Sequence, residues 1–155
     1  MCGYLGDPSG RCRCTAEQIQ RYRSRISGPL LDRIDIHIEV PPVAHSVLNQ
    51  PIDPQAPTSA EIRERVIRVR EMQLARDGKS AHQLTPKEIA KRCALESITK
   101  ALLENAAMRL GLSARAYHRI LKVARTIADL EGSERIDDAH LAEAISYRTL
   151  DRKVS

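Results

Sequence analysis

Three of the four cysteines lie close together near the start of the chain: Cys2, Cys12 and Cys14. Thiolates are good zinc ligands, and a short loop that carries three of them can approach the tetrahedral geometry of this ion. Because a structural zinc site has four ligands, these cysteines are interpreted as an incomplete possible zinc site or, alternatively, as plain thiols. Cys93 belongs to a predicted helix, where we expect a small buried thiol.

A second chemical feature is an arginine near the start of a predicted helix. Ser113 is expected to cap this helix, which places Arg115 at its second position. A cation there opposes the helix dipole, at a cost of roughly 0.3–1 kcal/mol, whereas the free N–H groups of the same helix end can bind a phosphate. Arg115 is therefore either a phosphate contact or an exposed surface residue. Arg119, one turn further on, is a weaker candidate for the same contact, with a solvent-facing position as its alternative.

The residues that hold the phosphates of a nucleotide and its magnesium ion are missing from this sequence. It contains no Gly-x-x-x-x-Gly-Lys-Ser/Thr loop and no acidic strand end that could hold Mg²⁺. We therefore expect that the chain does not hydrolyse ATP on its own and binds it weakly or not at all.

The composition is that of a small basic protein with an aliphatic core. The 155 residues include 25 Lys and Arg, 20 Asp and Glu, four Tyr, and no Trp or Phe. The net charge of +5 fits a salt-bridged helical surface or a weak attraction to polyanions. No stretch approaches the roughly 18 apolar residues of a membrane span, and no signal segment opens the chain. We expect a cytoplasmic protein with no membrane partner.

The chain divides into two regions joined by a linker. Residues 1–42 contain a predicted helix over 15–25 and a predicted strand, Ile34–Val40, in which apolar and polar residues alternate. One helix and one strand cannot bury each other's faces, so this region is interpreted as the edge of a larger domain. Residues 43–57 contain three prolines and are predicted to be the linker.

Residues 58–155 are predicted to form a bundle of five amphipathic helices. Capping residues indicate the helix starts, and glycines indicate three of the ends. The expected starts are Thr58, Thr85, Leu95, Ser113 and Asp137, and the glycine stops are Gly78, Gly111 and Gly132. The stripes predicted to face inward on the first and third helices are Ile62, Val66, Val69 and Gln73, and Ile98, Leu102, Ala106 and Leu110.

Several ordered motifs resemble one protein family. The segment Arg25-Ile-Ser-Gly-Pro-Leu-Leu-Asp-Arg33-Ile-Asp-Ile resembles the motif that ends the ATPase core of the magnesium-chelatase-like AAA+ family, and related replicative helicases share its pattern. The opening Cys-Gly-Tyr, the later Cys-x-Cys and the final Ala-Ile-Ser-Tyr147-Arg148 are similar to the bacterial ComM/YifB branch of that family. The resemblance covers nearly all of the chain.

This resemblance implies a mainly α fold. Residues 58–155 would be the C-terminal helical-bundle AAA+ lid. Residues 1–42, with the Cys-rich loop and the arginine-finger segment, would be a remnant (a short helix plus a strand) of the trailing part of the α/β ATPase core. The family has a further cysteine ahead of the position of Met1, which would account for the incomplete zinc set. The chain is thus expected to be a C-terminal fragment, monomeric by itself.

The resemblance also implies roles for the arginines. Arg33 would be an arginine finger that acts in trans on a neighbouring subunit of a hexameric ring, and the alternative is an ion pair with Asp32 or Asp35. The segment from Leu112 to Arg119 resembles the sensor-2 motif, in which Arg115 would contact the γ-phosphate in cis. ATP and Mg²⁺ would be bound by the full-length parent, with no cofactor held tightly by the fragment. The parent would act on DNA, in branch migration during natural transformation.

Two other functions remain open on the sequence. A stand-alone basic helical module could bind nucleic acid through Arg63, Arg70 and Lys79, with an affinity that falls steeply with salt. A small zinc-dependent interaction domain is the other alternative. Neither explains why residues 1–42 lack packing partners of their own.

Overall fold

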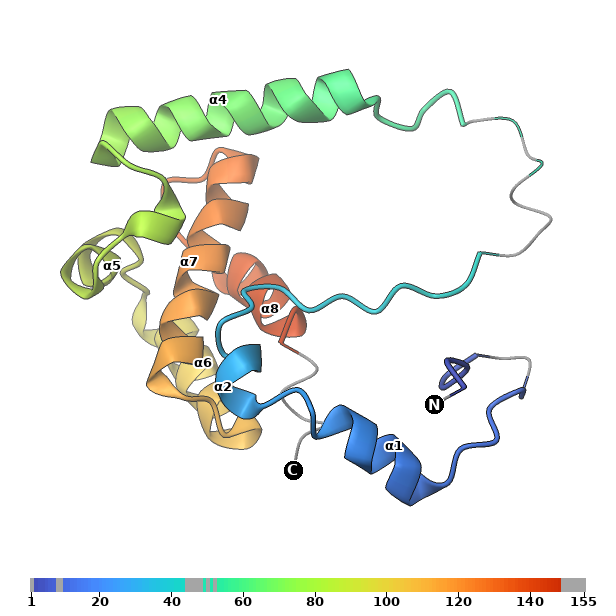
Figure 1. Ribbon diagram of the computed structural model, residues 1–155. Helices are drawn as coiled ribbons and strands as arrows, with labels where there is room; N and C mark the ends of the chain where they lie inside the picture. The colour runs from blue at the N-terminus through green and yellow to red at the C-terminus, as the bar shows by residue number, and fades with distance from the viewer. Residues whose placement is uncertain (1, 8–9, 44–48, 50, 52, 149–155) are drawn as a thin grey trace.

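The computed structural model describes residues 2–7, 10–43, 49, 51 and 53–148, and these fold mainly into α-helices (Figure 1). The elements, in chain order, are α1 (Ala16–Arg23), α2 (Gly28–Leu31), α4 (Ser59–Asp77), the 3₁₀ turn η1 (Ala81–Gln83), α5 (Pro86–Arg92), α6 (Ser97–Leu110), α7 (Ala114–Glu131) and α8 (Asp138–Ser146). None of the helices in the described ranges is both long and apolar enough to cross a bilayer.

The helix starts follow the local signals in the sequence. The side chains of Thr15 and Thr58 accept hydrogen bonds from the backbone N–H groups three residues on. The side-chain oxygens of Gln18 and Glu61 accept from the backbone N–H groups of Thr15 and Thr58, which completes two capping boxes. Thr85 and Glu88 form a third box at α5. Glycines in the left-handed conformation end α4, α6 and α7, as predicted.

The core is built around α7. This helix contacts α4, η1, α5 and α8, and Figure 1 shows it running through the middle of the bundle. Its buried apolar residues meet those of the surrounding helices in one cluster, which contains Leu84, Ile89, Cys93, Leu103, Ile120, Leu121, Ala124, Ile127, Ala128, Ile136, Leu141 and Ala144. The predicted aliphatic helical bundle is therefore confirmed.

The inward face of α6 differs from the predicted one. Ile98 is 78% exposed and Leu102 is 38% exposed, whereas Thr99 and Leu103 are buried. The two stripes are one residue apart, so the helix presents a face rotated by about 100° from the expected one. Leu102 and Leu103 each belong to an apolar stripe with helical spacing. Packing against the other helices determines that Leu103, and not Leu102, faces the core.

The inward face predicted for α4 is also largely wrong. Ile62 and Val66 are exposed, and of the expected stripe only Gln73 is buried. The reason is that α4 is longer than the surface it covers. Its C-terminal half lies against α7, while its N-terminal half extends past the bundle (Figure 1).

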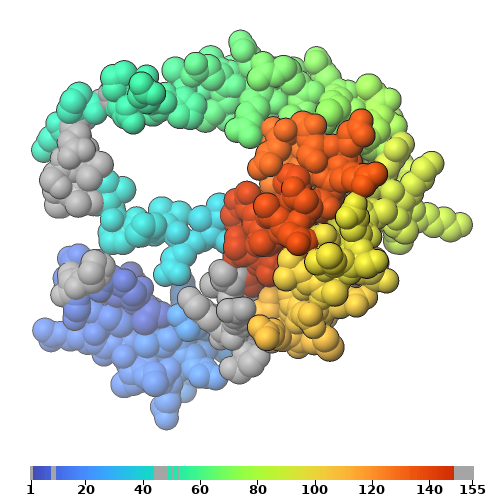
Figure 2. Space-filling view, turned by 180° about the vertical axis from the view of Figure 1, so that it is seen from behind, coloured from blue at the N-terminus to red at the C-terminus, as the bar shows by residue number. Residues whose placement is uncertain are grey.

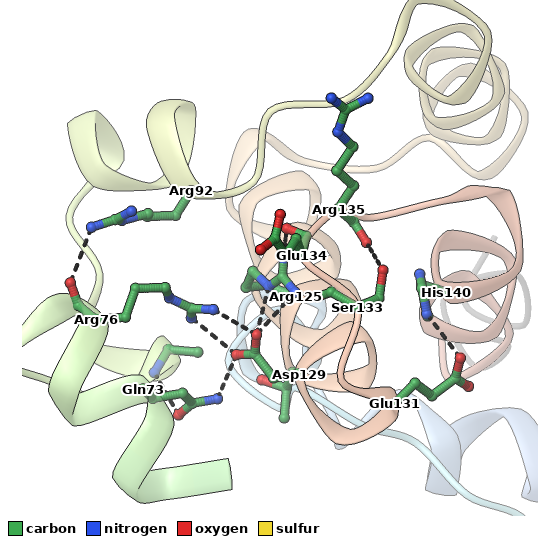
Figure 3. Close-up of polar contacts among 12 residues, drawn as sticks. Gln73, Arg76, Arg92, Arg125, Asp129, Glu131, Ser133, Glu134, Arg135 and His140 are labelled. Atoms are coloured by element: carbon green, nitrogen blue, oxygen red, sulfur yellow. Dashed lines mark hydrogen bonds and ion pairs between the residues drawn. The ribbon is translucent and has the colours of Figure 1, made fainter.

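A buried charged network attaches α4 to α7 (Figure 3). Asp129 accepts hydrogen bonds from Arg76 (2.7 and 3.0 Å), Gln73 (3.0 Å) and Arg125 (2.9 Å). Arg125 is itself buried and donates to the carbonyl oxygens of Ser133 and Glu134. Because each charge has partners, the network fixes one arrangement of the two helices without an unpaired buried ion.

The strand predicted over Ile34–Val40 is not confirmed, because the described residues contain no β-strand. A strand needs a neighbour that completes its backbone hydrogen bonds, and in this segment we find one such link, from His37 N–H to the carbonyl oxygen of Tyr147 (2.9 Å). The region before it is largely exposed: α1 buries no residue. Figure 2 shows these N-terminal residues, in blue, as a mass beside the helical bundle.

Candidate functional site

A pocket of about 540 Å³ lies along one face of α7. Arg115, Arg119 and Lys122 line it, spaced four and three residues apart on that face. His82 and His118 contribute imidazole rings, while Asp35 and Glu143 contribute carboxylates. The pocket is therefore lined by three basic side chains and two carboxylates, a composition that favours an anionic ligand.

Two of these cations already have protein partners. Arg119 forms an ion pair with Asp35, and its Nε is buried without a hydrogen-bond partner among the described residues. Lys122 donates a hydrogen bond to the carbonyl oxygen of His82 (2.8 Å). Arg115, in contrast, is exposed in the first turn of α7. It is the cation of this face that can reach an incoming ligand with the least rearrangement.

The start of α7 is joined to the segment that contains Arg33. The Ser113 hydroxyl accepts a hydrogen bond from the backbone N–H of Ala116 (3.1 Å), which makes it the N-cap. The same hydroxyl donates to the carboxylate of Asp32 (2.7 Å). Asp35 reaches α7 through Arg119, so two carboxylates that flank Arg33 both contact the first turns of this helix.

Arg33 itself bonds to a different group. It is exposed, and its Nη1 donates to the carbonyl oxygen of Pro29 (2.8 Å). The alternative in which Arg33 pairs with Asp32 or Asp35 is not observed in the described part of the chain, since those carboxylates contact other groups. The guanidinium is therefore held at the surface on a short turn after α2.

Arg148 was missed as a site residue by the sequence reasoning, which placed it only within a motif. Its side chain is 0% exposed, and its Nη1 donates to the carbonyl oxygen of Ile34 (2.5 Å). Its Nη2 lies 3.7 Å from the carboxylate of Asp32. A fully buried arginine two residues after α8 thus holds the backbone next to Arg33. The signal in the sequence was an arginine directly after a predicted apolar helix face.

The three N-terminal thiols converge, as their spacing suggested. The Sγ atom of Cys2 lies 3.6 Å from that of Cys12 and 3.3 Å from that of Cys14. A hydrogen bond from the backbone of Tyr4, assisted by the thiol of Cys14, lowers the pKa of Cys2 to about 7. Cys93 is buried in the helical core, as expected, and burial raises its pKa to about 11. The Cys2 thiol is therefore more easily deprotonated than the buried Cys93 thiol.

Comparisons with known proteins match both regions. The family described as "Magnesium chelatase, subunit ChlI C-terminal" matches residues 56–148, and "Magnesium chelatase, subunit ChlI" matches residues 1–48. The competence protein ComM of Haemophilus influenzae is 50% identical over 140 residues, which are 90% of this chain and 27% of ComM. YifB of Escherichia coli is 46% identical over 140 residues, 90% of this chain and 28% of YifB. The chain spans roughly a quarter of the length of these relatives.

Proposed function

Because the chain belongs to the magnesium chelatase ChlI family and corresponds to its C-terminal region, we propose that it forms the lid of an AAA+ ATPase and supplies an arginine finger. The observation that carries the proposal is the cationic face of α7, with Arg115, Arg119 and Lys122 in one pocket. The exposed Arg33 lies on the segment that Asp32 and Asp35 bond to this helix. ATP is the substrate. The matching region makes up 27% of ComM and 28% of YifB, so an ATPase core can precede it. Such a core would bind ATP together with Mg²⁺, which neutralises phosphate charge during transfer.

Arg115 is the sensor in this proposal. Its guanidinium contacts the γ-phosphate in cis, from the first turn of α7, where the helix N–H groups add a favourable dipole for the anion. Arg119 lies one turn further and pairs with Asp35. A phosphate that approaches Arg119 therefore competes with Asp35, and Arg119 contributes when this ion pair opens.

Arg33 completes the active site of a neighbouring subunit. An arginine finger has to be charged and planar and has to be held on a defined backbone, and the bonds from Ser113 and Arg148 to the segment around Arg33 provide that backbone. The bond from Ser113 also links the segment around Arg33 to the start of α7. Phosphate contact at Arg115 in one subunit is thereby coupled to the position of Arg33 at the next, within a hexameric ring of identical chains.

The work that hydrolysis drives is proposed to be movement on DNA, as in branch migration during natural transformation. The resemblance to the ComM branch supports this role, and the printed name of the Haemophilus relative is that of a competence protein. The alternative, direct nucleic-acid binding by this chain alone, is less supported by its structure. Of the three cations considered for it, Lys79 is paired with Glu88 (2.9 Å).

The test of the sensor assignment uses the longer ATPase that contains this chain. Arg115→Ala is expected to lower the rate of ATP hydrolysis on the order of 10-fold or more, because it removes a charge-assisted hydrogen bond to the phosphate. Arg119→Ala is expected to have a smaller effect in the same direction. The matched control is Arg135→Ala, which removes an exposed arginine paired with Glu96 outside the pocket. Wild-type rate and ATP affinity in Arg115→Ala would refute the sensor role.

A further inference from the structure

The loop before α1 brings three thiols together that the proposed ATPase function does not use. The Sγ atoms of Cys2, Cys12 and Cys14 all lie within 4.8 Å of one another. They come from the two ends of a loop of about a dozen residues. No buried apolar residue of this loop explains the convergence, because the described part of it is exposed or half-exposed.

The loop has a defined path. Gly3, directly after Cys2, has a φ angle of 78°, in the left-handed region that other residues rarely adopt, and this turns the chain back at once. The guanidinium of Arg11 lies over the ring of Tyr4, 4.3 Å from its centre, and 3.5 Å from the carboxylate of Asp7. These contacts bring the start of the loop, at Cys2, close to its end, at Cys12 and Cys14.

The distances between the sulfur atoms lie near, and slightly below, those between thiolates on one metal ion. A Zn–S bond is about 2.3 Å long, so two thiolates on a tetrahedral zinc ion are separated by about 3.8 Å. The observed separations from Cys2 are 3.6 Å to Cys12 and 3.3 Å to Cys14. Three thiols also cannot pair among themselves, because one disulfide would leave the third thiol over. A single ion can use all three.

We propose that Cys2, Cys12 and Cys14 bind one zinc ion as thiolates and leave its fourth position to a ligand from outside these three residues. Binding releases the thiol protons, so the site forms more readily as the pH rises. The ion closes the loop directly before Thr15, the N-cap of α1. It therefore fixes the entry to the helix that precedes the arginine-finger segment, at a place where the described residues have no core of their own.

The test is a metal titration of the 155-residue chain, purified without metal under reducing conditions. Cobalt(II) is added first, because tetrahedral cobalt–thiolate complexes absorb in the near ultraviolet and the visible. One equivalent per chain is expected to saturate the spectrum, and zinc is expected to displace the cobalt. Cys14→Ser is expected to weaken binding on the order of 100-fold, since it removes one of three ligands.

The matched control is Cys93→Ser, which removes the buried thiol of the helical region and is expected to leave the cobalt spectrum intact. Because the loop lies outside the helical core, Cys14→Ser is expected to keep the circular dichroism of the parent chain, which excludes misfolding as the cause of lost binding. The proposal is overturned if the unmodified 155-residue chain gives no thiolate–cobalt band at one equivalent. It is also overturned if Cys14→Ser binds cobalt as tightly as the parent.

Discussion

The helical region and the N-terminal region obtain their structures in different ways. Residues 59–148 contain a complete apolar core around α7, together with a buried charged network. Among the described residues before position 44, only Leu31 and His37 are buried. The N-terminal region takes its place from a few bonds to the other region, at Asp32, Ile34, Asp35 and His37. The helical region thus has a core of its own, whereas the described N-terminal residues bury few side chains and are held by single bonds to that region.

Removing Asp129 should give the largest loss of stability in the helical region. Asp129→Ala leaves Arg125 buried and deprives Arg76 of its main partner, so we expect a loss of about 3–5 kcal/mol in the free energy of unfolding. Denaturant unfolding followed by circular dichroism measures it. Glu134→Ala, on an exposed neighbouring side chain, is the control and should change stability by less than about 0.5 kcal/mol. Equal effects of the two variants would show that the network is not needed.

A pair of adjacent leucines tests the observed face of α6. Leu103→Ala should cost about 2–4 kcal/mol, because the side chain is fully buried and the change leaves a cavity. Leu102→Ala makes the same chemical change one residue earlier, on a partly exposed side chain, and should cost distinctly less. The two unfolding midpoints, measured side by side, give the comparison. The reverse order would mean that the stripe predicted from the sequence is the true one.

Two helix caps separate the stability of the bundle from the attachment of the N-terminal region. Ser113→Ala and Thr58→Ala each remove an N-cap, and each should cost about 1 kcal/mol. Ser113 also donates to Asp32, so only Ser113→Ala should speed the hydrogen exchange of the backbone amides in 31–37. Exchange measured by NMR or mass spectrometry decides this. Unchanged exchange in Ser113→Ala would mean that this bond does not hold the segment.

Glu88 gives the smallest expected effect, a pH dependence. Hydrogen bonds from the backbone N–H of Thr85 and from Lys79 lower its pKa from an ordinary 4.5 to about 2. A lowered folded-state pKa stabilises the protein above the ordinary value, and this stabilisation is lost as the pH falls from about 4.5 to about 2. Glu88→Gln should flatten the fall of the melting temperature in this range. Glu104→Gln, on the surface of α6, is the control and should leave the profile as it is.

The sequence predicted local features well and long-range ones poorly. Helix starts at Thr58 and Thr85 and stops at Gly78, Gly111 and Gly132 depend on neighbouring residues, and the structure confirms them. The buried faces of α4 and α6 depend on the helices that pack against them. The periodicity of apolar residues within one helix does not identify these packing partners. The strand at Ile34–Val40 failed for the same reason, because alternation describes a strand but does not supply its partner.

The candidate site also combines local features, which the sequence predicted, with long-range contacts, which it did not. The structure confirms the helix cap at Ser113 from which Arg115 was predicted as a site residue, and the roles of Arg115 and Arg33 stay predictions. The roles of Asp35 and Arg148 depend on contacts over 84 and 114 residues of sequence, to Arg119 and to the carbonyl oxygen of Ile34. Such pairs become visible only when the fold brings them together.

The central claim is that Arg33 acts on the neighbouring subunit. Two variants of the longer ATPase test it: Arg33→Ala, and a variant whose phosphate-binding lysine in the upstream core is replaced. Each ring alone should be nearly inactive, with a loss on the order of 10³-fold for Arg33→Ala at unchanged ATP affinity. In equal mixtures, about a quarter of the sites pair an intact core with an intact finger, and activity should recover to about that fraction. Mixed rings that assemble but show no recovery would contradict the account.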